Sequence, residues 1–149
     1  MVQIVIMVIG MRLITFSLFG DNPLYCVGAV ENAKIARVIY PEWTARFYVA
    51  QDVPEHYIEE IEGYGAEVVR CEKKNSYDGL NWRFRPLYDP SVECWISRDA
   101  DSRLSWRERN AVDEWLDSDR SNYFRTNVVA TYSTRSRMSR LLETCKDSW

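Results

Sequence analysis

Residues 13–23 read LITFSLFGDNP and residues 92–103 read VECWISRDADSR, and these two stretches decide the fold. Each begins with apolar residues typical of a buried strand and ends in a polar turn. Asn22 before Pro23 is a typical helix start, and Ser105 with Glu108 forms a capping box at the start of another helix. Both stretches therefore predict a strand that leads through a polar turn into a helix.

The same alternation fills the sequence between them. Further strands are predicted over residues 45–49 and 66–71, a helix between Pro54 and Gly63, and a short helix over residues 79–87. Four alternations of strand and helix predict an α/β, Rossmann-like fold with a mostly parallel sheet and flanking helices. The first helix, from Pro23 to Pro41, presents six apolar residues at roughly helical spacing: Leu24, Val27, Val30, Ile35, Val38 and Ile39.

Composition limits the classes of function. The chain has 149 residues, 46% hydrophobic and 28% charged, which fits one globular domain. The net charge of −3 disfavours a nucleic-acid binder that works through bulk positive charge. The four cysteines are widely spaced, which predicts reduced, mostly buried thiols and a cytoplasmic protein: Cys26, Cys71, Cys94 and Cys145.

The two ends differ from the body. Residues 1–10 form an apolar extension that lacks the charge pattern of a signal peptide, and Arg12 interrupts the apolar run before it is long enough to span a bilayer. The body, residues 11–119, has a net charge of −7. Residues 120–149 have a net charge of +4 and contain many Ser and Thr. We expect this tail to have uncertain structure, so that an uncovered sheet edge favours self-association.

The turn after the strand that begins at Val92 carries the main chemical signal. Ligands of parallel sheets bind at the carboxyl ends of the strands, where Asp99 and Asp101 stand two residues apart. Two nearby carboxylates repel unless a cation lies between them, and Mg²⁺ or Mn²⁺ prefers such oxygen ligands. Arg98 and Arg103 flank the pair and suit a phosphate. Alone, this D-x-D pattern is also typical of a solvated turn.

Four segments together carry a family resemblance. They read FSLFGDNPLYCVGAVENAKIARVIYPEWTARFYV, VPEHYIEEIEGYGAEVV, GLNWRFRPLYDP and RDADSR. Over residues 12–119 the chain resembles the GT-A-type glycosyltransferases, which use a D-x-D motif after a central strand. The resemblance implies a nucleotide-sugar donor, an acceptor of unknown identity, and Mn²⁺ or Mg²⁺ held by Asp99 and Asp101.

The resemblance also implies donor contacts. It places the loop after the first strand near the nucleotide base, through Ser17, Phe19 and Gly20. Arg83, in the W-R-F segment, is a candidate donor contact, and Arg103 is a candidate for the phosphates. An alternative is that Arg83 pairs structurally with Asp78 or Asp89.

The tail departs from the family pattern. Residues 120–149 do not resemble the family's continuation and contain no histidine, so we expect a truncated member that transfers sugar poorly. A non-catalytic remnant or interaction protein that keeps the fold is an alternative. A haloacid-dehalogenase-like phosphatase is a weaker one, because that class carries D-x-D on its first core strand.

Overall fold

The computed structural model describes residues 10–118, 122–125 and 128–132. Most of the elements lie where the sequence predicts them. The two predicted helix caps are confirmed: the Asn22 side chain accepts a hydrogen bond from the Leu24 amide (3.0 Å), and the Ser105 hydroxyl accepts one from the Glu108 amide (3.3 Å). The elements are β1 (Met11–Leu18), α1 (Pro23–Ile39), β2 (Thr44–Ala50), α2 (Glu55–Gly63), β3 (Glu67–Cys71), α3 (Asp78–Asn81), the 3-10 helix η1 (Trp82–Tyr88), β4 (Val92–Arg98), α4 (Trp106–Leu116), β5 (Asn122–Arg125) and β6 (Val128–Tyr132).

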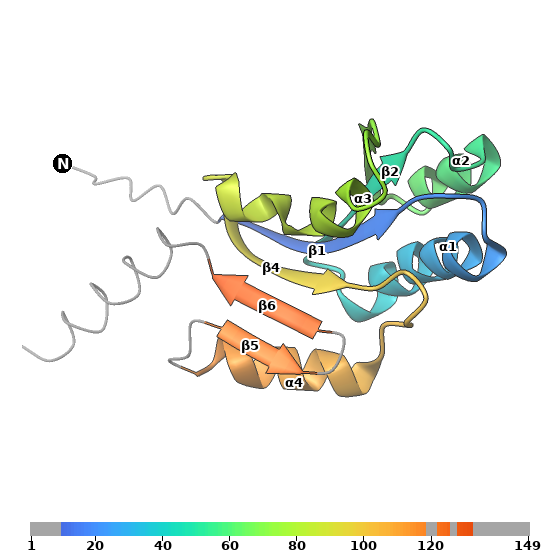
Figure 1. Ribbon diagram of the computed structural model, residues 1–149. Helices are drawn as coiled ribbons and strands as arrows, with labels where there is room; N and C mark the ends of the chain where they lie inside the picture. Colours follow the sequence, from blue (N-terminus) through green and yellow to red (C-terminus); the bar gives the residue numbers. More distant parts are fainter. Residues whose placement is uncertain (1–9, 119–121, 126–127, 133–149) are drawn as a thin grey trace, which may run out of the picture.

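The six strands form one sheet in the order β3-β2-β1-β4-β6-β5 (Figure 1). The first four are parallel: β1 lies between β2 and β4, and β3 pairs with β2. β6 runs antiparallel to β4, and β5 runs antiparallel to β6. The predicted Rossmann-like, mostly parallel sheet with flanking helices is confirmed.

The expectation for the tail is wrong in one respect. Residues 122–132 supply β5 and β6, and β6 pairs with β4 from Cys94 to Arg98, so the edge of β4 is not uncovered. The run VVATY over residues 128–132 is rich in β-branched and aromatic residues, which suit a strand despite the basic charge around them. The apolar extension over residues 1–9 and the tail beyond residue 132 lie outside the described residues.

The two faces of the sheet are covered differently. The main core lies on the face covered by α1, α2 and α4, where Phe16 stacks on Phe47 with ring centroids 4.5 Å apart. The other face is covered by α3 and η1, which lie across β1 and β4 from α1 and α4 (Figure 1). Trp82 of η1 is buried on this second face, as a core residue.

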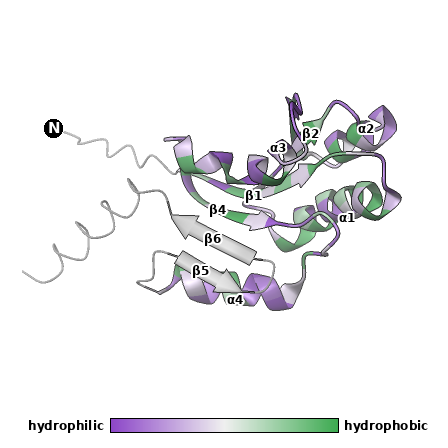
Figure 2. Ribbon diagram, in the orientation of Figure 1, coloured by the Kyte–Doolittle hydropathy of each residue, from purple (hydrophilic) through white to green (hydrophobic). Residues whose placement is uncertain are grey.

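Small residues, rather than large ones, form the buried side of α1. Ala29, Ala33 and Ala36 are buried together with Val30 and Ile39. The sequence expectation is only partly correct, because three of the apolar residues at helical spacing are exposed: Leu24, Val27 and Val38. Small side chains let α1 approach the sheet closely and leave the larger ones outward, so the helix is hydrophobic over much of its surface (Figure 2).

Three cysteines are described, and all are buried and outside any disulfide: Cys26, Cys71 and Cys94. Cys145 lies outside the described residues. Across residues 10–118 and the two final strands, no helix is long and apolar enough to cross a membrane.

We predict that Ala33→Leu destabilises the protein by roughly 1–3 kcal/mol, because three extra carbons must fit between α1 and the sheet, where Ala33 is 1% exposed. Val38→Leu is the matched control on the same helix, since Val38 is 66% exposed, and it should change stability by less than about 0.5 kcal/mol. Urea denaturation of both variants measures the difference, and equal stabilities would contradict the close packing of α1.

Candidate functional site

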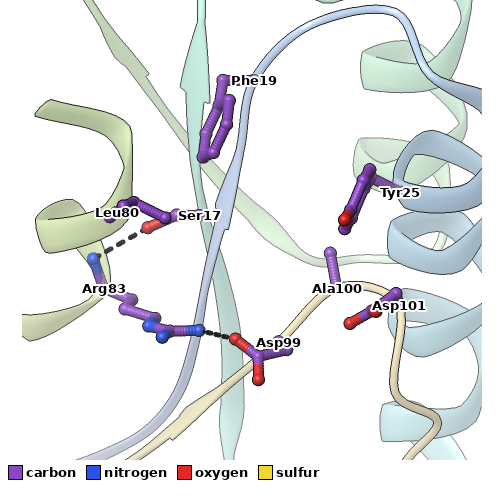
Figure 3. Close-up of a pocket in the computed structure, with 8 residues that line it drawn as sticks. All are labelled: Ser17, Phe19, Tyr25, Leu80, Arg83, Asp99, Ala100 and Asp101. Carbon is purple, nitrogen blue, oxygen red and sulfur yellow. Dashed lines mark hydrogen bonds and ion pairs between the residues drawn. The ribbon is translucent and has the colours of Figure 1, made fainter. Parts of the chain in front are cut away.

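A pocket of about 290 Å³ opens at the carboxyl ends of β1 and β4. This is the edge where ligands of parallel α/β sheets bind. Its polar floor and apolar walls come from β1, α1, α3, η1 and the loop after β4 (Figure 3). The lining residues are Ser17, Phe19, Tyr25, Leu80, Arg83, Asp99, Ala100 and Asp101.

The two aspartates lie in this pocket together. The backbone that carries them is a turn, closed by a hydrogen bond from the Ser102 amide to the Asp99 carbonyl (3.2 Å). The carboxylate of Asp101 is turned toward Asp99 (Figure 3). The structure thus brings together the two residues that sequence reasoning singled out.

Helix α1 holds this turn through a buried amide. The fully buried Asn32 side chain donates to the carbonyls of Ala100 (3.2 Å) and Ser102 (2.9 Å) and accepts from the Leu104 amide (3.0 Å). One turn earlier, Gly28 lies so close that a β-carbon there would stand 2.3 Å from the Ala100 carbonyl oxygen. A polar residue and a glycine on the buried side of α1 therefore position the aspartate turn.

The two flanking arginines do not enter the pocket. Arg98 is 4% exposed and turns toward α4, where its guanidinium forms an ion pair with Glu108 (2.9 Å) and donates to the Arg103 carbonyl (3.3 Å). Arg103 is exposed, does not line the pocket, and has a guanidinium nitrogen close to Gly28. Arg98 therefore joins the end of β4 to α4.

Arg83 is fixed by β1 and paired with Asp99. Its amide donates to the Ser17 hydroxyl (3.0 Å), and its carbonyl accepts from the Thr15 hydroxyl (2.7 Å). Its guanidinium forms an ion pair with Asp99 and also donates to the Arg98 carbonyl (3.3 Å). The alternative pairing with Asp78 or Asp89 is wrong: the Asp78 carboxylate accepts from the Lys74 amide (2.8 Å), and Asp89 lies 3.8 Å from Arg46.

Phe19 and Gly20 lie at the end of β1, where three loops meet. The Phe19 ring packs against Gly79, where a β-carbon would stand 2.4 Å from a ring carbon, and the Lys73 ammonium lies 5.2 Å from the ring centroid. Gly20 has a positive φ of 76°, and its amide donates to Asp52 (2.8 Å). Chiefly this hydrogen bond lowers the pKa of Asp52, and Lys73 lowers it further. Gly20 itself does not line the pocket.

The donor chemistry of the pocket fits a divalent cation that a ligand helps to hold. Within the described ranges, no group of three or more His, Cys, Asp and Glu side chains converges, so the protein offers no complete cage. Mg²⁺ or Mn²⁺ can bind to two carboxylates in an open pocket, with water and phosphate oxygens as the remaining ligands of the ion. Asp99 and Asp101 are the residues that fit this role.

Sequence reasoning missed four residues around the site. Tyr25 and Leu80 form apolar walls, and Asn32 and Asp52 position the loops. Asn32 carried a usable signal, because a polar residue in the buried stripe of a helix requires polar partners. Tyr25 lies in the first turn of the helix that follows β1, which is also readable from the sequence. Nothing local in the sequence marks Asp52 as the partner of Gly20.

Comparison with known proteins finds similarity in structure alone. No family model matches the chain, and no curated protein matches its sequence. The galactosyltransferase LgtC, in complex with donor and acceptor sugar analogues, matches 92% of this chain and 66% of its own at a TM-score of 0.52 and 14% identity. The mannosyltransferase PcManGT from Pyrobaculum calidifontis, in complex with GDP-Man and Mn²⁺, matches 87% of this chain and 46% of its own at 0.50 and 14%.

A third solved structure is the 4-diphosphocytidyl-2C-methyl-D-erythritol synthase from Anaerococcus prevotii, which matches 73% of this chain and 53% of its own with 15% identity and a TM-score of 0.46. The chain thus spans from about half to about two thirds of the length of these structures. At 14% identity, the matches to the galactosyltransferase and the mannosyltransferase show a shared fold. The structural neighbours of this chain include GT-A-type glycosyltransferases, in agreement with the fold that the sequence resemblance implied.

We predict that Gly28→Ala destabilises the protein by roughly 1–3 kcal/mol and displaces the aspartate turn, because the new methyl group meets a backbone carbonyl that cannot rotate away. Gly63→Ala is the matched control: a β-carbon at the end of α2 meets nothing within 4 Å, and it should be neutral or stabilising by up to about 1 kcal/mol. Thermal unfolding compares the two variants. Equal effects at both glycines would contradict the close contact between α1 and the turn.

Proposed function

We propose that this protein binds a nucleoside-diphosphate sugar together with Mg²⁺ or Mn²⁺ and acts as a glycosyltransferase. One observation carries the proposal: Asp99 and Asp101 share a pocket at the carboxyl edge of a parallel sheet. The fold shared with a galactosyltransferase and a mannosyltransferase supports it, and the Mn²⁺ in the latter structure supports the choice of cation.

The pocket suits the diphosphate end of such a donor. Asp99 and Asp101 would hold the cation against the diphosphate oxygens, which supply the remaining ligands. Arg83 lies beside them as a fixed positive charge, because β1 anchors its backbone through Thr15 and Ser17. The Nε atom of Arg83 is buried and has no hydrogen-bond partner within the described residues. The rigid backbone of Arg83 allows its guanidinium to meet a ligand oxygen without first being ordered.

The proposed role of the residues follows from where charge develops. When the bond between sugar and diphosphate breaks, negative charge accumulates on the leaving phosphate oxygens. A divalent cation held by Asp99 and Asp101 would act there as a Lewis acid. Arg83 adds a preorganised positive charge at the same place, and Asn32 keeps the aspartate turn from moving as the charge builds. Phe19, Tyr25 and Leu80 provide apolar walls that limit the access of water.

Arg103 and Gly20 do not line the pocket, so a direct contact of either residue with the donor has less support. Arg103 is exposed, and it would reach a phosphate only if the ligand extends beyond the pocket. Gly20 acts through its hydrogen bond to Asp52, which holds the loop that begins at Phe19. The base-binding role that the resemblance implies therefore rests mainly on Phe19 and Ser17 in this proposal.

We expect calorimetry to detect UDP or GDP binding in Mn²⁺ or Mg²⁺ and to lose it in excess chelator. Asp101→Asn should weaken metal-dependent binding by roughly tenfold or more, because one of two protein ligands is lost while the side-chain volume is kept. The melting temperature should stay unchanged, because Asp101 is exposed. Glu59→Gln, an exposed carboxylate on α2, is the matched control and should bind as the unaltered protein does.

Equal affinity with and without chelator would overturn the metal-dependent site. Turnover separates the remaining alternatives. Release of the nucleoside diphosphate from a nucleotide sugar, lost in Asp101→Asn, supports a glycosyltransferase. Binding without any release supports a non-catalytic protein that keeps the fold. Hydrolysis of a generic phosphate ester, lost in Asp99→Asn, would instead favour the phosphatase.

A further inference from the structure

The two carboxylates of the pocket differ in their partners. The Asp99 carboxylate forms an ion pair with the Arg83 guanidinium, which points toward it in Figure 3. Asp101 is exposed, and within residues 10–118 its carboxylate forms no ion pair. Two carboxylates and one guanidinium together carry a formal charge of −1. A divalent cation therefore meets only half of the negative charge that the aspartate pair alone would present.

Arg83 holds this position without help from the other arginines near the turn. The guanidinium of Arg98 pairs with Glu108 of α4, and Arg103 is exposed and does not line the pocket. Among the described residues that line the pocket, Arg83 is the only one with a positive charge. Its charge therefore acts directly on an ion that the two aspartates bind.

The ion pair with Asp99 is not what holds the backbone of Arg83 in place. The Thr15 and Ser17 hydroxyls of β1 bond to the carbonyl and the amide of Arg83, and the neighbouring Trp82 and Pro86 are buried. None of these contacts involves the guanidinium. The side chain can therefore exchange one partner for another while η1 stays on the sheet.

The present partners of the guanidinium use few of its donors. Both of its hydrogen bonds, to the Asp99 carboxylate and to the Arg98 carbonyl, come from Nη1. The Nε atom is buried and has no hydrogen-bond partner within the described residues. A guanidinium has five N–H donors in a planar fork, and a phosphate can accept two of them in parallel. A phosphate group is thus a better partner for Arg83 than the partners it has now.

We propose that Arg83 couples the binding of the cation to the binding of the diphosphate. While it is paired with Asp99, the guanidinium repels a cation that arrives alone and competes with it for the carboxylate. When a diphosphate arrives with the cation, the guanidinium moves to a phosphate oxygen and releases Asp99. The same arginine therefore weakens the binding of the cation alone and strengthens the binding of the two ligands together. This inference rests on the proposed function, because it concerns the same cation and the same diphosphate.

The test compares Arg83→Met with the unaltered full chain in two measurements. The first follows Mn²⁺ alone through the electron paramagnetic resonance signal of the free ion, and the second follows UDP and GDP in saturating Mn²⁺ by calorimetry. We expect Arg83→Met to bind Mn²⁺ alone roughly fivefold more tightly, because Asp99 loses its competing cation. We expect it to bind the nucleotide roughly tenfold more weakly, because a contact with a phosphate is lost. A variant that failed to fold could not produce two effects of opposite sign.

Arg37→Met is the matched control. It removes the same charge from an exposed position on α1 that does not line the pocket, so solvent and salt screen its effect. Both affinities should change by less than about twofold.

Two results would contradict the coupling. One is an Arg83→Met variant that binds Mn²⁺ alone no more tightly than the unaltered protein does. The other is a variant that binds the nucleotide as tightly as before, which would leave Arg83 as a structural partner of Asp99. If the proposed function is wrong, neither protein binds UDP or GDP at any concentration of Mn²⁺, and the coupling fails with it. If only the coupling is wrong, the unaltered protein keeps its metal-dependent nucleotide binding, and the two effects of Arg83→Met do not have opposite signs.

Discussion

The buried amide of Asn32 is the interaction on which the site depends. A turn after a strand has no ladder of backbone hydrogen bonds to fix it, yet two carboxylates must be held at one place on this turn. Asn32 supplies the missing partners for three backbone groups at once, and it does so from a helix that packs on the sheet through small residues. Burying an amide is unfavourable unless its hydrogen bonds are made, so the position of the turn and the close packing of α1 are mutually dependent. Gly28 belongs to the same arrangement, because any larger residue would separate the helix from the turn.

The second constraint is electrostatic. A pocket that holds two carboxylates without a bound cation has unfavourable repulsion, and Arg83 reduces it by pairing with Asp99. This arginine is itself anchored from its backbone, since Thr15 and Ser17 of β1 bond to its carbonyl and amide. The buried pair of Arg98 and Glu108 acts on the opposite face, where it joins the end of β4 to α4. Two arginines at this edge of the sheet thus have different partners: Arg83 pairs with Asp99 in the pocket, and Arg98 pairs with Glu108 of α4.

Much of the fold could be predicted from the sequence, because the decisive signals are local. Each of these signals spans only a few residues: an apolar run that ends in a polar turn, the caps at Asn22 and Ser105, and the D-x-D spacing. The predictions that were wrong concern contacts between segments that are distant in the sequence. The exposed side of α1 could not be read from hydrophobicity, because small alanines form its buried side. The strand at residues 128–132 was hidden by the charge of its surroundings, and its paired residues in β4 lie 30 to 38 positions earlier. In the site, the predicted residues that line one pocket are Asp99, Asp101, Arg83, Ser17 and Phe19, whereas Arg103, chosen as a neighbour in sequence, is exposed and does not line it.

The strand order also determines the sequence of events in folding. β1 lies between β2, which follows it closely in the chain, and β4, whose paired residues are 81 or 82 positions away. During synthesis the segment from β1 to β3 can assemble as a local unit, but one side of β1 then presents unpaired amides and carbonyls until β4 has emerged. Since pairing across so long a stretch of chain is slow, this interval is when the nascent protein is most exposed to strand addition by other chains. The central position of β1, which later builds the floor of the pocket, therefore makes it the most vulnerable strand of the unfinished molecule.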